Sequence, residues 1–377
     1  DGNEILTRID NGKPPPIIKY HIVLLDEGSM IDDETATEII DYVEKGNKTL
    51  IILGDYCQLP PVNQETDSLF FDDISAELTI PVRATGPVFD LATVIRKEII
   101  KIRNNEIPSI NIINLTLNRV SKLDEKGSGY IFLQGFETLI KAAIRRFKKD
   151  RGTQYVRVLA YRNKTIDRIN MRIRTGLYGD NPKQFEEGEI VINNGGYSVK
   201  IPGKKDTQVV IRNGTVLQVK STEDCIGPYD IPCKKLIFKD SGSPDTDIKE
   251  VVYVVATEGE SLYKDNLNRL SAMAKTRELS WSVFWEFKNS FAYFNYNYAT
   301  SIHKAQGSSI QHVFVMEDDV LSVRLTSTKE KLQSMYTAIS RASYRVYVYN
   351  GAFKTDNSNI LQEQLILDVP EETCEEH

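Results

Sequence analysis

Cysteine and long apolar runs are both scarce in this chain. Its four cysteines, Cys57, Cys225, Cys233 and Cys374, have neither the spacing of metal ligands nor the density of a disulfide scaffold. No run approaches the roughly 20 apolar residues that cross a bilayer, and no signal peptide opens the sequence. We therefore expect reduced thiols, no structural zinc and a cytoplasmic location.

An excess of positive charge is also absent, since 47 Lys and Arg stand against 53 Asp and Glu. The formal net charge of −6 argues against a surface coated with phosphate-binding Lys and Arg side chains. A local basic groove can nevertheless coexist with a negative net charge. At 377 residues and 41% hydrophobic composition, the chain is long enough for two or three globular domains.

A glycine-rich phosphate loop of the form G-x-x-x-x-G-K-[ST] is absent from the sequence. Gly203-Lys204-Lys205 lacks the upstream glycine, and we do not expect it to act as a substitute. The sequence begins at Asp1 rather than at a methionine, which favours a polypeptide that starts inside a longer reading frame.

Two apolar runs, residues 22–25 and 50–53, flank a segment whose apolar residues recur at helical spacing. Strand, helix and strand predict a βαβ unit, and the continuous apolar runs predict strands of a parallel sheet that are buried on both faces. Asp26 and Glu27 directly follow the first run. Open α/β sheets bind ligands at the carboxyl ends of their strands, so these carboxylates stand where a magnesium nucleotide would be held.

A second α/β pattern follows a helix ending near residue 103 and a candidate boundary at residues 104–108. We expect a helix at 164–174 and core strands at 156–160, 313–316 and 346–349.

From about residue 188 to 274 the apolar period switches to two, which predicts an antiparallel β-barrel inserted in the second α/β domain. The strand candidates are residues 189–192, 208–212, 215–220, 235–238 and 250–255. Asn213-Gly214 predicts a tight hairpin, because both residues tolerate positive φ.

Phosphoryl transfer to water needs a metal at the phosphate oxygens, a group that activates water, and cations where charge accumulates. Asp26 suits the metal and Glu27 the water, although an Asp-Glu pair after a strand also suits a helix N-terminus. Gln58 follows the second strand and could contact the γ-phosphate; alternatively it is a turn residue held by Pro60-Pro61.

Arg83 and Arg341 are candidates for the cations of that transition state. Most arginines of this kind are surface residues or cap a helix C-terminus. As a pair supplied from two domains, they could close on one nucleotide as arginine fingers.

Five segments in order carry a resemblance to superfamily 1B helicases. Residues 26–30, Asp-Glu-Gly-Ser-Met, resemble motif II, with Ser-Met where the opposite-polarity branch has Gln-Asp. Residues 54–62 resemble motif III and residues 79–83 motif IV. Residues 298–308 resemble motif V and residues 335–342 motif VI. The resemblance covers nearly the whole chain, is closest to the Dda-like and RecD-like helicases, and suggests a phage source. It implies an α/β fold with two RecA-like motor domains, ATP-driven 5′→3′ translocation on single-stranded DNA, and an SH3-like barrel in the second motor.

The resemblance also implies residue roles. The nucleotide would contact Asp26, Glu27, Gln58, Arg83, Gln306, Gly307 and Arg341, with Mg²⁺ held by Asp26 through water. DNA would contact Pro60, Tyr161, Asn163, Thr300, His303 and Lys304. A lone histidine is usually structural, but within His-Lys-Ala-Gln-Gly the functional interpretation is favoured.

The implied domains are a pin remnant at 1–18, the C-terminal part of the first motor at 19–105, the second motor at 106–187 and 275–377, and the barrel at 188–274. In this family the phosphate loop lies upstream of motif II, so we expect the chain as given to bind ATP poorly and hydrolyse it negligibly unless the missing part arrives on another chain.

Two alternatives remain open: an ATPase-deficient nucleic-acid-binding or scaffolding protein, and one half of a split helicase. For the leading hypothesis we expect a monomer whose partners are single-stranded DNA, fork DNA, and replication or recombination proteins. The aromatic residues Trp281, Phe284, Trp285, Phe287 and Phe291 follow helical spacing, so we expect core packing rather than base stacking.

Overall fold

The computed structural model describes residues 19–61, 64, 66–71, 76–78, 86–108, 120–150, 155–200, 207–239, 251–323 and 327–351, with 198–200 and 207–210 described by their backbone alone. Arg83 and the rest of the motif at 79–83 lie outside these residues. So do the predicted pin remnant at 1–18, Gly203-Lys204-Lys205 and Cys374.

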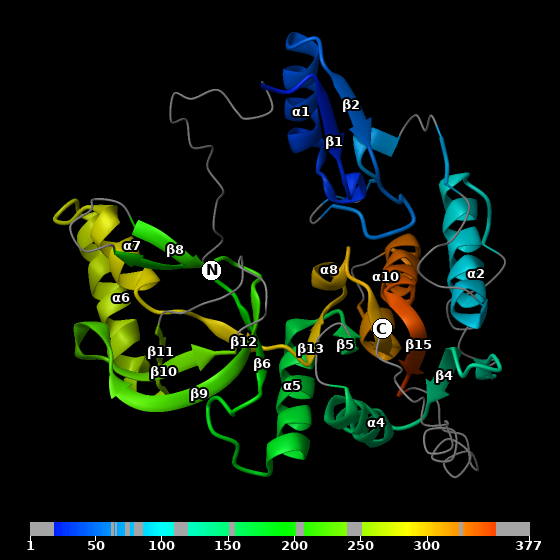
Figure 1. Ribbon diagram of the computed structural model, residues 1–377. Helices are drawn as coiled ribbons and strands as arrows, with labels where there is room; N and C mark the ends of the chain where they lie inside the picture. The colour runs from blue at the N-terminus through cyan, green and yellow to red at the C-terminus, as the bar shows by residue number, and fades with distance from the viewer. Residues whose placement is uncertain are drawn as a thin grey trace.

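The first sheet consists of β1 (Ile22–Leu25) and β2 (Thr49–Ile52), which pair in parallel and are joined by α1 (Asp33–Lys45). The predicted βαβ unit is therefore confirmed; it is the blue part of Figure 1. The helix begins at Asp32, whose carboxylate accepts the Thr35 N–H at 2.8 Å.

The predicted burial of these strands is wrong. Ile22 and Leu24 are 63% and 62% exposed, and Ile51 on the neighbouring strand and Leu53 directly after it are exposed as well. Residues at alternate positions of a strand share one face of the sheet. Within the described chain one face of β1 and β2 is therefore left uncovered, although its residues are as apolar as those of a core strand.

The second sheet has six strands in the order β13-β5-β14-β15-β4-β3. Five are mutually parallel and β3 pairs antiparallel at one edge. The strands are β13 (Ala299–Ser301), β5 (Val156–Ala160), β14 (Ile310–Met316), β15 (Ala342–Tyr349), β4 (Gly129–Leu133) and β3 (Lys122–Leu123). The predicted strands at 156–160, 313–316 and 346–349 are thus confirmed.

Helices cover both faces of the second sheet. On one face, Phe314 and Met316 pack with α4 (Phe136–Lys149) and α5 (Asn163–Tyr178). On the other, Val313 and Val315 pack with α2 (Gly86–Arg103) and α10 (Thr328–Ser340). A parallel sheet covered on both faces is the α/β arrangement that the sequence predicts, and it fits a RecA-like motor domain.

Helix α2 packs against α10, β15 and β4 of the second sheet. Its buried residues Val88, Ile95 and Ile99 belong to the same core as β14 and β15. The predicted domain bounds would assign this helix to the first motor, and they stay a prediction.

A third unit, green to yellow in Figure 1, is antiparallel. Its five-stranded sheet has the order β11-β10-β9-β6-β12, and a separate hairpin pairs β7 with β8. The strands are β6 (Ile190–Asn193), β7 (Tyr197–Lys200), β8 (Thr207–Ile211), β9 (Val216–Ile226), β10 (Pro232–Phe238), β11 (Val252–Val255) and β12 (Phe294–Tyr296). The antiparallel class is as predicted, and an SH3-like barrel stays a prediction. Helix α6 (Glu260–Lys275), inside the predicted barrel range, was not expected.

The predicted hairpin at Asn213-Gly214 is wrong in its pairing. Gly214 does lie in a turn with φ of +81°, but β8 pairs with β7, while β9 pairs with β6 and β10. The turn is instead held by Asn193, whose carbonyl accepts the Gly214 N–H at 2.8 Å and whose N–H donates to Thr215 at 2.9 Å.

The aromatic stripe on α7 (Trp281–Asn289) is only partly a core face. Phe287 and Phe291 are buried, with Phe287 stacked on Tyr263, as predicted. The prediction is wrong for Trp281 and Trp285, which are exposed because α7 buries a single face. Within the described ranges, no helix is long and apolar enough to cross a membrane, and Cys57, Cys225 and Cys233 are free thiols.

Candidate functional site

The carboxylates after β1 occupy a tight turn at the end of the first sheet. Glu27 has a left-handed backbone with φ of 52°, which is uncommon for a residue with a side chain. The Gly28 N–H donates to the Leu53 carbonyl at 2.8 Å, and a Cβ on Gly54 would come within 3.1 Å of the Gly28 nitrogen. Both strand ends therefore approach closely because glycines occupy these positions. The exposed Asp26 carboxylate accepts the Glu27 N–H at 2.8 Å.

Glu27 contacts residues of the loop that leads from α8 (Ile302–Ala305) to β14 of the second sheet. The Gln306 side chain donates Nε2–H to Glu27 Oε2 at 3.3 Å, and a Cβ on Gly307 would lie 3.5 Å from Glu27 Oε1. The structure thus brings three predicted nucleotide-contacting residues together. The Oε1 atoms of Gln306 and Gln58 are shielded from solvent and have no hydrogen-bond partner within the described chain. Each is an acceptor that a bound group could satisfy.

The predicted DNA contacts gather at the carboxyl ends of β5 and β13. His303 lies in the short helix α8 (Ile302–Ala305), and its ring packs edge-on against Tyr161 with centroids 5.8 Å apart. Burial lowers the pKa of His303, which favours the neutral ring. Lys304 is exposed, with Nζ 3.4 Å from Asn194 Oδ1, and Thr300 lies on β13. Asn163 begins α5 and is exposed.

Sequence reasoning missed Asp319, which holds the loop carrying two of these residues. Its buried carboxylate accepts the N–H groups of Tyr161 and Arg162, both at 2.8 Å, and the Thr165 hydroxyl at 2.6 Å. It also forms an ion pair with Arg162 at 2.6 Å. Asp319 lies in α9 (Glu317–Leu321), three residues after the buried strand β14 ends, so the acidic run after that apolar strand is the sequence signal that points to it.

Helix α10 links this loop to the loop after β2. Near its start, Glu330 accepts the Tyr161 hydroxyl at 2.9 Å, and burial with this contact raises the pKa of Tyr161 to about 12. Further along, the Tyr336 hydroxyl donates to Asp55 at 2.7 Å and the Thr337 hydroxyl accepts the Leu59 N–H at 3.1 Å. Gln58 and Pro60, which flank Leu59 in the loop after β2, are both half-buried.

Arg341 follows α10 and is only 1% exposed. Its guanidinium donates to the Thr337 carbonyl at 3.1 Å and to the Ser308 carbonyl at 3.4 Å. Ser308 directly follows Gly307, so Arg341 and Glu27 both contact the short loop at 306–308. The guanidinium is packed inside the protein rather than projecting into solvent.

Known proteins resemble this chain in one segment and over most of its length. Residues 296–349, which carry Gln306, Gly307 and Arg341, match the family model of the UvrD-like helicase C-terminal domain. Over 360 residues the chain is 24% identical to the ATP-dependent DNA helicase Dda of Enterobacteria phage T4, covering 88% of this chain and 76% of that protein. The chain is a superfamily 1B helicase homologue.

Among solved structures, the chain is similar to the Pif1 helicase from Candida albicans, with 17% identity and a TM-score of 0.38, covering 91% of this chain and 76% of that one. It is also similar to a Bacteroides Pif1 helicase in complex with ADP-AlF3 and ssDNA, with 14% identity and a TM-score of 0.39, covering 95% and 78%.

Proposed function

We propose that the chain is the motor of an ATP-dependent DNA helicase that binds ATP between its two parallel sheets and moves along single-stranded DNA. The contact between Glu27 and Gln306 carries this proposal. It joins the carboxylate after β1 of the first sheet to the loop before β14 of the second sheet. Homology to Dda supports the helicase class. We propose the 5′→3′ direction because the motifs resemble those of the superfamily 1B branch.

The nucleotide would lie against the turn after β1. Asp26 supplies exposed carboxylate oxygens, which suit Mg²⁺ held through water. When bound, the metal would neutralise charge on the phosphate oxygens. Glu27 would accept a proton from the attacking water, and the unpartnered Oε1 atoms of Gln58 and Gln306 would hold that water in place. Arg341, with Arg83, would face the γ-phosphate once the sheets close on it.

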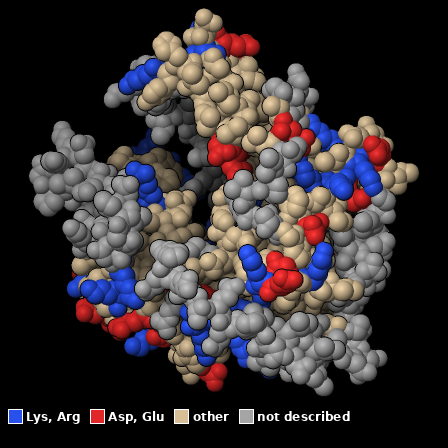
Figure 2. Space-filling view, turned by 45° about the vertical axis from the view of Figure 1, so that its right-hand side comes forward, with Lys and Arg blue, Asp and Glu red and all other residues tan. Residues whose placement is uncertain are grey.

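The strand would bind at the carboxyl ends of β5 and β13, where Tyr161, Asn163, Thr300, His303 and Lys304 lie, with Pro60 on the other side. On the face that Figure 2 shows, the described Lys and Arg residues lie in separate groups among acidic residues rather than in one continuous band. Fork DNA and replication or recombination proteins are the partners we propose, for a monomer.

The exposed face of β1 and β2 supports a first motor that is completed by further α/β structure bearing the phosphate loop. Ile22, Leu24 and Ile51 would be the surface on which that structure packs. It could belong to the same polypeptide or to a second chain, and without it we expect poor ATP binding. The remaining units would be the second motor and an SH3-like barrel at 188–274.

An ATPase-deficient nucleic-acid-binding or scaffolding protein is the second candidate, favoured by the absence of a phosphate loop from the sequence. DNA-stimulated ATP hydrolysis separates the two. We expect hydrolysis when the phosphate-loop segment is present, and unwinding of a duplex with a 5′ tail but not of one with a 3′ tail. Strand binding without hydrolysis in the completed protein would instead establish the scaffolding role.

A further inference from the structure

A cavity of about 500 Å³ separates α5 from α6 and the five-stranded antiparallel sheet. None of the predicted nucleotide or DNA contacts lines it. Its walls include Asp167 and Met171 from α5, Gln184 from the loop after α5, Glu260 and Lys264 from α6, and the aromatic residues Tyr263, Phe291, Tyr293, Phe294 and Tyr296. Its size is within the range of pockets that bind small ligands or single side groups.

The aromatic wall offers faces on which a planar group can stack. Tyr293 is 64% exposed although it lines the cavity, so its ring is available to an incoming group. Phe291 and Phe294 are buried and form the apolar base of the same wall. Stacking on such rings is tolerant of sequence because every nucleobase has a π-face.

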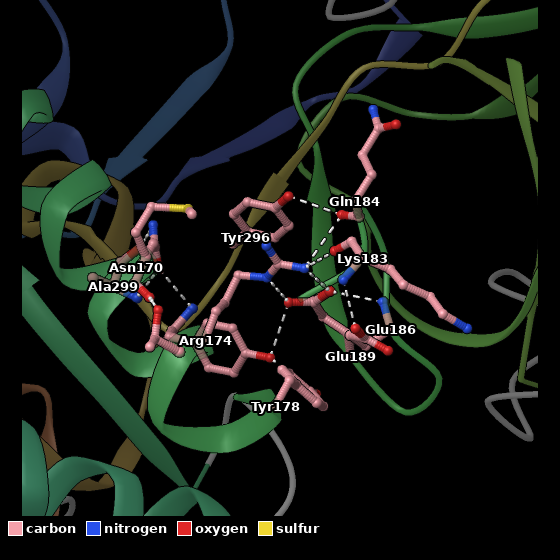
Figure 3. A network of polar contacts seen from close by, with 12 residues as sticks. Asn170, Arg174, Tyr178, Lys183, Gln184, Glu186, Glu189, Tyr296 and Ala299 are labelled. Atoms are coloured by element: carbon pink, nitrogen blue, oxygen red, sulfur yellow. Dashed lines mark hydrogen bonds and ion pairs between the residues drawn. The ribbon is translucent and has the colours of Figure 1, made fainter. Parts of the chain in front are cut away.

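One side of the cavity is held rigid by a buried ion pair. Arg174 donates Nη2–H to Glu189 at 3.0 Å and to the Lys183 carbonyl at 2.6 Å, and its guanidinium lies 3.8 Å from the centre of the Tyr296 ring. The Tyr296 hydroxyl in turn donates to the Gln184 carbonyl at 2.8 Å. Figure 3 shows this network, with the Gln184 side chain directed away from it. Tyr296 and the Gln184 backbone are therefore fixed before any ligand arrives.

The polar groups of the cavity favour a neutral donor over a phosphate. Gln184 Nε2 donates to the Val255 carbonyl at 3.0 Å, while its Oε1 is shielded from solvent with no partner among the residues described. Asp167 adds an exposed carboxylate, and Lys264 is already paired with Glu260 at 2.8 Å. Two carboxylates against one paired lysine would repel a phosphate. An N–H group on a planar ring would satisfy these acceptors.

The cavity also continues a line of residues that starts at the proposed DNA site. Asn163, Asp167 and Met171 are spaced by four and are all exposed, so they form one stripe along α5. Asn163 is the proposed DNA contact, whereas Asp167 and Met171 line the cavity. Eight residues of helix rise about 12 Å, so a strand held at Asn163 reaches the cavity within a few nucleotides.

We propose that this cavity receives one nucleobase with an exocyclic amine, from a single strand that runs along α5. This inference rests on the proposed function, since the strand must first bind at Asn163. The base would stack on the Tyr293 side of the cavity and donate its amine to Gln184 Oε1 or Asp167. Thymine lacks the exocyclic amine and can donate only its single N3–H, so it would satisfy these acceptors less well.

Binding of fluorescent dC-only and dT-only oligonucleotides of equal length tests the proposal by anisotropy at fixed salt. We expect Tyr293→Ser to weaken dC binding about tenfold, the low end for one stacked base, and to weaken dT binding much less. Tyr20→Ser is the matched control, because Tyr20 is 62% exposed and lies outside the cavity. It should bind both oligonucleotides as the wild type does, and equal thermal midpoints would show that all three proteins are folded.

The outcomes separate the cavity from the broader function. If the wild-type protein binds neither oligonucleotide, DNA binding itself fails. If it binds both and Tyr293→Ser matches it on both, the cavity assignment is overturned. Free dCMP serves as a competitor: displacement of the strand at dCMP concentrations near the strand's own dissociation constant would assign the cavity to a free nucleotide and overturn the strand model. Photocrosslinking of 5-bromodeoxycytidine in the strand to Tyr293 would support it directly.

Discussion

Gln306 donates its side-chain N–H to Glu27 at 3.3 Å, although 279 positions separate the two residues in the chain. Glu27 lies in the turn after β1 of the first sheet, whereas Gln306 follows α8, the helix that carries His303 and Lys304. A change in the charge or position of the Glu27 carboxylate is thus felt directly by the segment proposed to hold DNA.

The role of Glu27 gives the first prediction. In protein that carries the phosphate loop, Glu27→Gln should lower the turnover number for ATP by about 100-fold or more, the usual contribution of a general base. The amide keeps the size of the side chain, so nucleotide affinity should change little. Steady-state ATPase assays and equilibrium nucleotide binding measure the two effects. Glu34→Gln, an exposed substitution on α1, serves as the control. Turnover that survives Glu27→Gln would show that another group activates the water.

The second prediction concerns helix α10, whose Glu330 accepts a hydrogen bond from the Tyr161 hydroxyl. Tyr161→Phe keeps the ring against His303 but removes this bond, so DNA affinity should stay near that of the wild type. Stimulation of ATP hydrolysis by DNA should fall about threefold, corresponding to one partly exposed hydrogen bond. Tyr344→Phe also removes a tyrosine hydrogen bond, to the Lys126 carbonyl, and should leave the stimulation unchanged. An equal loss in both variants would argue against a specific link through α10.

The third prediction concerns the buried ion pair of Arg174 and Glu189. Arg174→Met leaves the Glu189 carboxylate buried without its partner, and we expect the free energy of unfolding to fall by about 3–5 kcal/mol. The double variant Arg174→Met/Glu189→Leu removes both charges and should recover most of that loss. Denaturant unfolding measures all three proteins. The explanation fails if the double variant is as unstable as the single one.

The fourth prediction concerns the stability of the protein at acidic pH. Burial, with Arg146, Arg345 and Lys149 nearby, lowers the pKa of His312 from 6.5 to about 3. The folded state therefore keeps this ring neutral, while the unfolded state protonates it near its ordinary pKa. Stability from His312 is complete above pH 6.5 and is lost as the pH falls toward 3, by up to about 1.4 kcal/mol per pH unit. In His312→Gln, the free energy of unfolding should fall less steeply between pH 6.5 and 4. Parallel profiles for the two proteins would contradict this.

The fold was largely predictable where apolar runs are continuous. Residues 156–160 and 313–316 are mostly apolar in sequence, which predicted core strands, and the structure buries every position of both in the second sheet. The same logic failed for β1, because a run of apolar residues specifies the need for burial but not the structure that provides it. In the antiparallel unit the strands were mostly located, yet Asn213-Gly214 could not indicate which strands pair.

The candidate site was predictable as short segments but not as a set of contacts. Asp26, Glu27 and Gln306 stand in patterns that indicate phosphate chemistry, whereas their meeting depends on how the two sheets dock. Arg174 and Glu189 carried no local signal, since a charged residue on a helix is ordinarily exposed. Only the packing of α5 against the antiparallel unit buries them together.

The uncovered side of β1 and β2 has a practical consequence for anyone purifying this chain. Among the residues described, Ile22, Leu24, Ile51 and Leu53 form an exposed apolar surface, and surfaces of this kind promote self-association. Sedimentation should then reveal a mixture of sizes whose average mass grows with protein concentration, and replacing Leu24 by lysine should shrink that mixture toward single molecules.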